Sequence, residues 1–245
     1  MASINLKHTS GNGTILNSPA ANPSADITLK LPSTTGSAGQ VLKVASANHS
    51  STNAELEFAA GGGGTGSLLE TITGQCDGRV VVGASGSYTF PNVTAVQTTT
   101  DTFTDITGSS ISYTPPTGTK RVVYRFSTYH GAVTYSGITY MKLLVDGTEV
   151  TQGREVISYD YQGSAHSVER IINEYTFITD ADSEDVANGK FTSWSSAKTI
   201  KFQAMRHGSS YTATFHKIRY WVDGSGNPST NSDAKPPMLT IQSFA

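Results

Sequence analysis

The sequence predicts an all-β protein, in which a jelly-roll-like antiparallel β-sandwich head follows an extended β-strand stem. Apolar and polar residues alternate with period two in many short segments, which are separated by Gly, Pro, Asn and Ser. No segment shows a convincing amphipathic helical pattern. The composition also changes at the glycine-rich run of residues 61–66. Together these observations predict a stem, a hinge and one β domain.

The first predicted part is a stem over residues 1–60. It is rich in Ser, Thr, Asn, Ala and Gly, and its apolar residues form short islands. Strands are expected at residues 26–32, 40–44 and 54–58, and each would be marginal alone. The islands bury too little apolar surface to offset the entropy of ordering the chain. We therefore expect this part to become ordered by packing on copies of itself or on a larger assembly.

The second part comprises a hinge over residues 61–66 and a connecting β-hairpin region over residues 67–94. No Lys-Ser/Thr pair follows the glycines and no helix begins there, so a hinge is favoured over a phosphate-binding loop. In the hairpin region, two short apolar strands flank the Gly- and Ser-rich turn of residues 83–87.

The third part is the head, residues 95–245. About 180 residues follow the hinge, which suits one β domain. Asp146-Gly147 is a hairpin turn signal between two strands, and residues 167–178 are the longest strand candidate. The remaining strands are expected at residues 110–114, 121–129, 140–145, 148–150, 198–206, 212–221 and 238–244. Their number and spacing favour a jelly-roll type of sandwich.

Composition and charge exclude several classes of protein. Charged residues make up 15% of the chain and the net charge is −2, so no global attraction for nucleic acid is expected. No apolar run approaches the roughly 20 residues that span a bilayer. No secretory signal is recognised at the N-terminus, so synthesis and assembly in a cytoplasm are expected. The single Cys76 is interpreted as an ordinary strand residue.

One acidic cluster is a candidate metal site. Asp180, Asp182, Glu184 and Asp185 place oxygen ligands at nearly alternating positions, as Ca²⁺ requires, but the glycine and distal glutamate of an EF-hand are missing. The alternative is an acidic loop that faces solvent. We therefore expect no cofactor, and Ca²⁺ is the one candidate ion at this cluster. The six histidines show no zinc-site spacing, and His216 is expected at a surface or subunit interface.

Aromatic residues in two connections are the candidate ligand-binding groups: Tyr129, His130, Tyr135, Tyr159 and Tyr161. Exposed tyrosines can stack on sugar faces while neighbouring polar groups bind hydroxyls. The alternative is that half or more of these residues lie in the core or an interface; we prefer that alternative for Tyr140 and leave both options open for Tyr159 and Tyr161. No nucleophile motif or catalytic constellation is recognised, so the chain is not expected to be an enzyme.

Three stretches of the stem carry a resemblance. They are Leu29-Lys30-Leu31-Pro32, the Gly36-to-Val44 segment containing Gly39-Gln40-Val41-Leu42, and Leu56-Glu57-Phe58-Ala59. This pattern resembles the stems of fibre-like structural proteins of tailed bacteriophages, especially marine ones. The head, from about Ala95 to Ala245, is similar in strand order and spacing to trimeric jelly rolls of the C1q/TNF-like kind.

The resemblance implies a homotrimeric virion appendage, assembled in the host cytoplasm. Its stem would bind other virion proteins, and its head would project as a tail fibre or spike and contact the host surface, where a glycan is one option for the partner. A capsid decoration protein without a receptor role is one alternative. A monomeric carbohydrate-binding module is the other.

Overall fold

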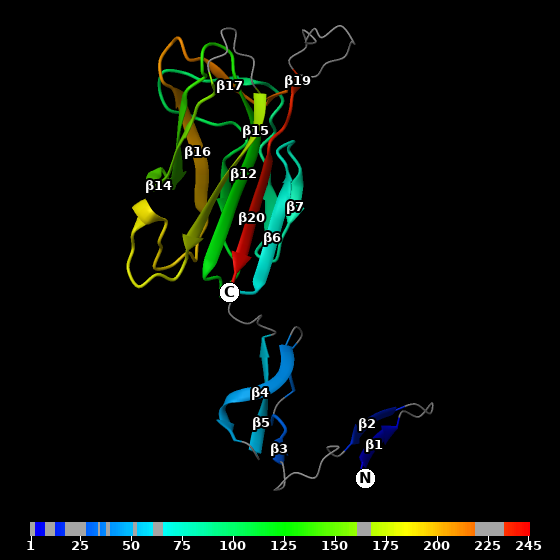
Figure 1. The fold of residues 1–245 in the computed structure, drawn as a ribbon. Helices are drawn as coiled ribbons and strands as arrows, with labels where there is room; N and C mark the ends of the chain where they lie inside the picture. The colour runs from blue at the N-terminus through cyan, green and yellow to red at the C-terminus, as the bar shows by residue number, and fades with distance from the viewer. Residues whose placement is uncertain are drawn as a thin grey trace. The chain divides into compact units, whose positions relative to one another are not determined.

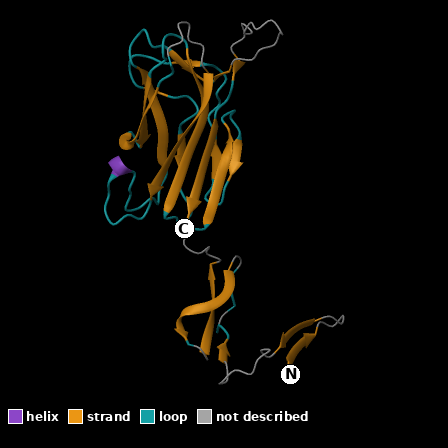
Figure 2. Cartoon of the chain, in the orientation of Figure 1, coloured by secondary structure: helices purple, strands orange, loops and turns teal. Residues whose placement is uncertain are grey.

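A computed structural model describes residues 3–7, 13–17, 28–33, 35–37, 40–50, 53–60, 66–160, 168–218 and 233–245. The predicted all-β, sandwich-type fold is confirmed (Figures 1 and 2). The chain divides into two compact units, Met1–Gly62 and Gly63–Ala245. We call the first unit the stem and the second the head. In the described part, no helix is long and apolar enough to cross a membrane.

The stem contains two small sheets. β1 (Ser3–Lys7) pairs antiparallel with β2 (Gly13–Asn17). The second sheet has the order β3-β5-β4, from β3 (Thr28–Lys30), β4 (Gln40–His49) and β5 (Asn53–Ala60). β3 runs parallel to β5 and β4 runs antiparallel to it. The three stretches quoted for the phage-fibre pattern therefore meet in one sheet.

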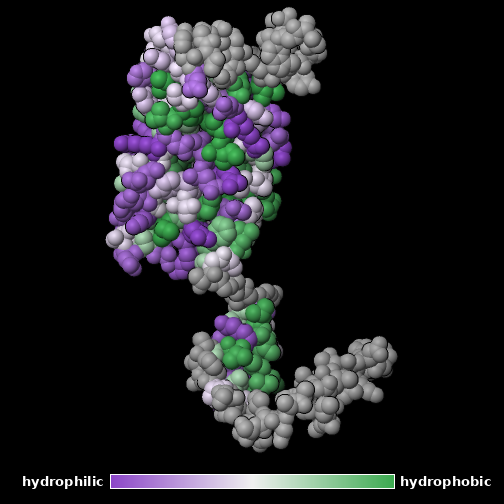
Figure 3. All heavy atoms as spheres, in the orientation of Figure 1, coloured by the Kyte–Doolittle hydropathy of each residue, from purple (hydrophilic) through white to green (hydrophobic). Residues whose placement is uncertain are grey.

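The three-stranded sheet has almost no core of its own. Among the stem residues whose side chains are described (28–33, 35–37, 40–45, 50 and 54–59), only Ala45 is buried. The large apolar side chains are 37–75% exposed: Leu29, Leu31, Val41, Leu42, Val44 and Phe58. Hydrophobic atoms accordingly dominate its visible surface in Figure 3. Gly36 lies against the Phe58 ring, because a Cβ there would stand 2.5 Å from Phe58 Cδ1.

The first sheet of the head has six strands, with β12 (Arg121–Ala132) at its centre. β15 (Val168–Ile178) pairs with β12 along almost its whole length, and β20 (Met238–Phe244) and β17 (Ala213–Phe215) take the other edge of β12. β6 (Leu68–Gln75) follows β20, and β9 (Gln97–Thr98) follows β17. All these pairs are antiparallel. The segment expected to be the longest strand, 167–178, is β15, which with 11 residues is shorter than the 12-residue β12.

The second sheet of the head has five strands. β16 (Lys198–Arg206) pairs with β13 (Thr139–Val145) on one edge and with β10 (Thr104–Asp105) and β11 (Ile111–Tyr113) on the other. β14 (Thr148–Ile157) is the outer neighbour of β13. The Asp146-Gly147 turn joins them with φ angles of 50° and 81°, as expected for a type I′ hairpin.

The core lies between the two sheets. Tyr124 and Phe126 of β12 meet Phe202 of β16 at ring-centroid distances of 5.8 and 6.4 Å. Phe177 of β15 packs against Trp194 and Phe191 in the connection that contains the short 3₁₀ helix η1 (Val186–Asn188). Aromatic side chains that are at most 5% exposed therefore hold the layers together.

A buried polar cluster attaches the hairpin of β7 (Val80–Val82) and β8 (Ser87–Thr89) to the sandwich. The Glu70 carboxylate is only 5% exposed and accepts hydrogen bonds from Ser85 N and Oγ, both at 2.7 Å, and from Tyr113 Oη at 2.6 Å. Tyr113 Oη also lies 2.5 Å from Ser243 Oγ on β20. Because both carboxylate oxygens have donors, the charge is tolerated inside the fold.

Two expectations about residues 212–221 are wrong. The predicted single strand is interrupted at His216, where φ is 65°, and β18 (Lys217–Ile218) then pairs with β19 (Asp233–Ala234) instead. His216 is also fully buried rather than at a surface. Its Nδ1 lies 2.8 Å from Thr128 Oγ1 and its backbone N–H donates to Tyr129 O. These contacts with β12 hold the unusual backbone conformation.

Candidate functional site: an aromatic strip beside a surface pocket

Two of the five predicted ligand-binding residues lie together in the interior. His130 is fully buried and Tyr159 is 9% exposed. His130 Nδ1 lies 2.9 Å from Tyr159 Oη, its Nε2 lies 3.0 Å from Thr139 Oγ1, and Tyr159 Oη donates to His130 O at 2.7 Å. Burial lowers the pKa of His130 to about 4. In this arrangement the pair joins β12 to the segment after β14 and offers no ring face to solvent.

The other three predicted residues lie apart from that pair. Tyr129 is partly buried and lines a small hollow of about 80 Å³ with Arg170 and Met238. Tyr135 is 50% exposed and has a left-handed backbone with φ of 47°. Tyr161 lies outside the described residues. The five residues therefore do not form one cluster.

The predicted metal ligands have separate local roles. Asp180 forms an ion pair with Lys120, and Glu184 Oε2 accepts from Thr192 N at 2.8 Å. Asp185 caps η1 by accepting from Asn188 N and Nδ2, and Asp182 is exposed. Within the described ranges, no group of three or more His, Cys, Asp or Glu side chains is placed to hold a metal ion. The structure does not bring the four carboxylates together.

A row of rings links two connections of the head and the start of one strand. Tyr135 lies 5.7 Å from Tyr211, Tyr211 lies 5.1 Å from His207, and His207 lies 5.7 Å from Tyr140, as measured between ring centroids. Tyr140 Oη is 2.7 Å from His207 Nδ1. We call these four residues the aromatic strip. It gathers the β12–β13 connection, the start of β13 and the turn after β16.

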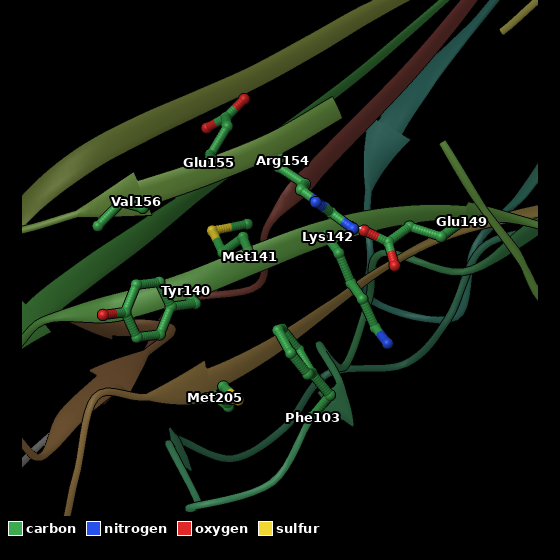
Figure 4. Close-up of a pocket in the computed structure, with 9 residues that line it drawn as sticks. All are labelled: Phe103, Tyr140, Met141, Lys142, Glu149, Arg154, Glu155, Val156 and Met205. Carbon is green, nitrogen blue, oxygen red and sulfur yellow. The ribbon is translucent and has the colours of Figure 1, made fainter. Parts of the chain in front are cut away.

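The strip ends at a pocket on the outer face of the five-stranded sheet, because Tyr140 belongs to both. The pocket has a volume of about 320 Å³. Nine residues line it (Figure 4): Phe103, Tyr140, Met141, Lys142, Glu149, Arg154, Glu155, Val156 and Met205. We call it the β13–β14 pocket.

The pocket lies where the ladder between β13 and β14 is irregular. Leu143 pairs with Val150 and Met141 pairs with Glu155, so residues 151–154 of β14 oppose Lys142 alone. Such a bulge bends the strand and redirects its side chains. Glu149 and Arg154, at the two sides of the bulge, are thereby brought together across it, and their side chains form an ion pair.

The charges of the pocket are unequally matched. The Arg154 guanidinium holds the pKa of Glu149 below its usual range, and Lys142 adds to this effect. Glu155 points away from the others in Figure 4 and accepts a hydrogen bond from Asn173, while burial raises its pKa. Lys142 Nζ lies 4.3 Å from the centroid of the Phe103 ring. Among the described residues, Lys142 forms no ion pair.

Aromatic faces, an apolar wall and a cation are groups that bind a ligand with both an apolar face and polar substituents. Of the residues predicted from sequence, only Tyr135 belongs to this site. Tyr140 was assigned to the core or an interface, and His207 and Tyr211 were not singled out. The sequence signal that could have identified them is the turn at residues 208–211, because it places the rings of His207 and Tyr211 beside the end of a strand.

No protein-family model matches the chain, and no curated protein matches it. Solved structures that are similar to it include those of the Gt and Gx strains of infectious bursal disease virus. The identities are 8% and 10%, and the TM-scores are 0.33 and 0.32. They cover 78% and 77% of this chain, which spans only 40% and 38% of theirs. Likeness at this level carries no argument about function.

Proposed function

We propose that the chain is a structural protein of a tailed-bacteriophage virion, a homotrimeric fibre or spike. Its stem binds other virion proteins and its head contacts the host surface without cleaving it. The observation that carries the proposal is the stem sheet, whose apolar side chains lie open to solvent. The phage-fibre pattern described above falls on this same sheet.

The stem sheet would be unstable if its apolar side chains stayed exposed to water. Full burial of one large apolar side chain contributes about 1.5–3 kcal/mol, and six such side chains are exposed in the stem sheet. Soluble monomers rarely leave contiguous apolar surface of this kind. A partner that covers the sheet would therefore supply the stabilisation that the stem lacks.

Further copies of the same chain suit this role. The charged residues whose side chains are described in the stem are Lys30, Lys43, Glu55 and Glu57, so their charges cancel. Lys43 and Glu57 already form an ion pair at 3.4 Å. Copies packed on one another would then meet no net repulsion. The number three comes from the resemblance of stem and head to trimeric appendages.

The mass of the full-length protein in solution tests the assembly. Sedimentation equilibrium should give about three times the chain mass of 25.9 kDa. A monomer up to high micromolar concentration would overturn the fibre proposal. It would favour the carbohydrate-binding module, for which the aromatic strip is the supporting observation.

Imaging tests the place of the protein in the particle. Gold-labelled antibody against the head should decorate intact virions, and the purified head-bearing protein should compete with virions for host cells. Labelling confined to the capsid shell, together with no competition, would favour the decoration role. Absence of label from the particle would contradict the virion assignment altogether.

A further inference from the structure

We propose that the β13–β14 pocket binds a carboxylate-bearing sugar, such as a hexuronic acid residue of an acidic surface glycan. The inference rests on the proposed contact with the host surface and names the chemistry of that contact. It commits to one ligand class because the charge of the pocket, its apolar wall and the spacing along β13 agree.

The charge of the pocket favours an anion. Glu149 is neutralised by Arg154, and Glu155 is turned toward Asn173, so Lys142 is the cation of the pocket that forms no ion pair among the described residues. Arg154 uses Nε for Glu149, so its terminal N–H groups remain to donate. A ligand carboxylate between Lys142 and Arg154 would gain charge-assisted hydrogen bonds from both.

The spacing along β13 favours a sugar ring that carries the carboxylate directly. Tyr140 and Lys142 are two residues apart on one strand and both line the pocket. Such neighbours on one face of a strand are separated by roughly 7 Å. A pyranose stacked on the Tyr140 ring would therefore direct the carboxylate on its C5 toward the Lys142 ammonium.

The wall of the pocket favours a ring with an apolar face over a bare anion. Met205 of β16 and Val156 of β14 flank Tyr140, and Val156 is 63% exposed. Carbon–hydrogen faces of a sugar would cover these side chains. A neutral sugar would gain the same contacts but would take water from Lys142 without giving it an opposite charge, so the ammonium would lose hydration without gaining an ion pair.

The four methionines provide reporters for a direct test. Met141 and Met205 line the β13–β14 pocket, whereas Met238 lies at the separate hollow beside Tyr129. The full-length protein, labelled with ¹³C at its methionine methyl groups, is titrated with tri-galacturonate. The expected result is saturable shifts of the Met141 and Met205 signals with Met238 unchanged, and weaker binding at high salt.

The fully methyl-esterified trimer of galacturonate serves as the matched neutral ligand. We expect it to bind at least tenfold more weakly, because it has the same rings without the charge. Equal affinity for acid and ester would overturn the acidic assignment. If the Met238 signal shifts as much as those of Met141 and Met205, or if no signal shifts with either ligand, the assignment of binding to the β13–β14 pocket is overturned.

Two lysine variants separate the pocket charge from general electrostatics. Lys142→Met removes the ammonium and keeps the apolar stem, so acid binding should fall at least tenfold and ester binding should stay the same. Lys198→Met is the control, since Lys198 Nζ also lies over a ring, that of Phe191 at 5.2 Å, but outside the pocket. Equal losses in both variants would contradict the proposal.

These experiments distinguish failure of the sugar-binding proposal from failure of the proposed virion function. If neither trimer of sugars binds, the solution mass and the labelling of virions still report on the appendage. If the protein is a monomer absent from virions, the methionine signals still report on the pocket. Should Lys142→Met fail to fold, the comparison of acid and ester on the unaltered protein decides the question.

Discussion

The stem and the head use the same period-two pattern with opposite results. In the head, Tyr124, Phe126 and Phe177 are fully buried, because a second sheet covers the face on which they lie. In the stem, Leu29 and Leu31 are 60% and 75% exposed, because within the described residues no second layer covers the sheet of β3, β4 and β5. Alternation therefore specifies strands, whereas a core needs a partner layer from this chain or from another.

The largest expected effect breaks the head and spares the stem. Phe202→Ala removes the ring between Tyr124 and Phe126, and it should lower the free energy of unfolding of the head by about 3–5 kcal/mol. Denaturant unfolding followed by tryptophan fluorescence measures this loss. Leu31→Ala in the stem is the control and should leave the head transition in place. A loss below about 1 kcal/mol would mean that the sheets are not held together at Phe202.

Acid should destabilise the head through its two buried histidines. Burial lowers the pKa of both His130 and His216 to about 4, from 6.5 in the unfolded chain. Between these values the unfolded state binds more protons than the folded state, so stability is present above pH 6.5 and is lost as the pH falls toward 4. From pH 7 to pH 5 each histidine should cost about 2 kcal/mol.

Urea unfolding at pH 7 and pH 5 measures this loss. The double variant His130→Gln, His216→Gln should be less stable at pH 7 but should show a much flatter dependence between the two pH values. An unchanged slope in that variant would assign the acid sensitivity to other groups.

The polar cluster at Glu70 should contribute less than the aromatic core. Tyr113→Phe removes the hydroxyl that donates to Glu70 and lies beside Ser243, and it should cost about 1–3 kcal/mol because the buried carboxylate loses a donor. Thermal unfolding measures the difference. Tyr175→Phe is the matched control, since no hydrogen bond of the Tyr175 hydroxyl is found among the described residues. Equal effects would show that Tyr113 stabilises the head by packing alone.

The sequence predicted where strands form better than it predicted which side chains of each strand face the core. The 167–178 strand and the Asp146-Gly147 turn follow from local pattern, and both occur in the structure. The break at His216 does not follow, because it depends on contacts with Thr128 and Tyr129 far away in the chain. Local alternation also fails to say which face of β12 is inside, so Tyr129 and His130 were treated alike although only His130 is fully buried.

The candidate site shows the same limit more strongly. The aromatic strip joins Tyr135 and Tyr140 to His207 and Tyr211, although Tyr140 and His207 are 67 positions apart in the sequence. The pairing of β13 with β16 sets Tyr140 opposite Met205, and the backbone N–H groups of Val133 and Thr134 donate to Thr212 O; these contacts between distant parts of the sequence bring the segments together. The pocket depends further on an irregular ladder, for which Gly153 within β14 is the residue signal, because a glycine inside a strand often marks a bulge.

The smallest expected effect on stability separates a binding tyrosine from a packing tyrosine. Tyr211→Ala removes a partly exposed ring of the aromatic strip, so the free energy of unfolding should change by no more than about 0.5 kcal/mol while attachment to host cells weakens. Tyr159→Phe is the contrast: it removes the hydroxyl that bonds His130, so it should cost about 1–2 kcal/mol and leave attachment unchanged. Thermal unfolding and a cell-binding assay on the same preparations measure both.

If Tyr211→Ala destabilises the head as much as Tyr159→Phe does, the strip is part of the packing of the head. If attachment depends on Tyr159 and not on Tyr211, recognition lies at the segment after β14 rather than at the strip.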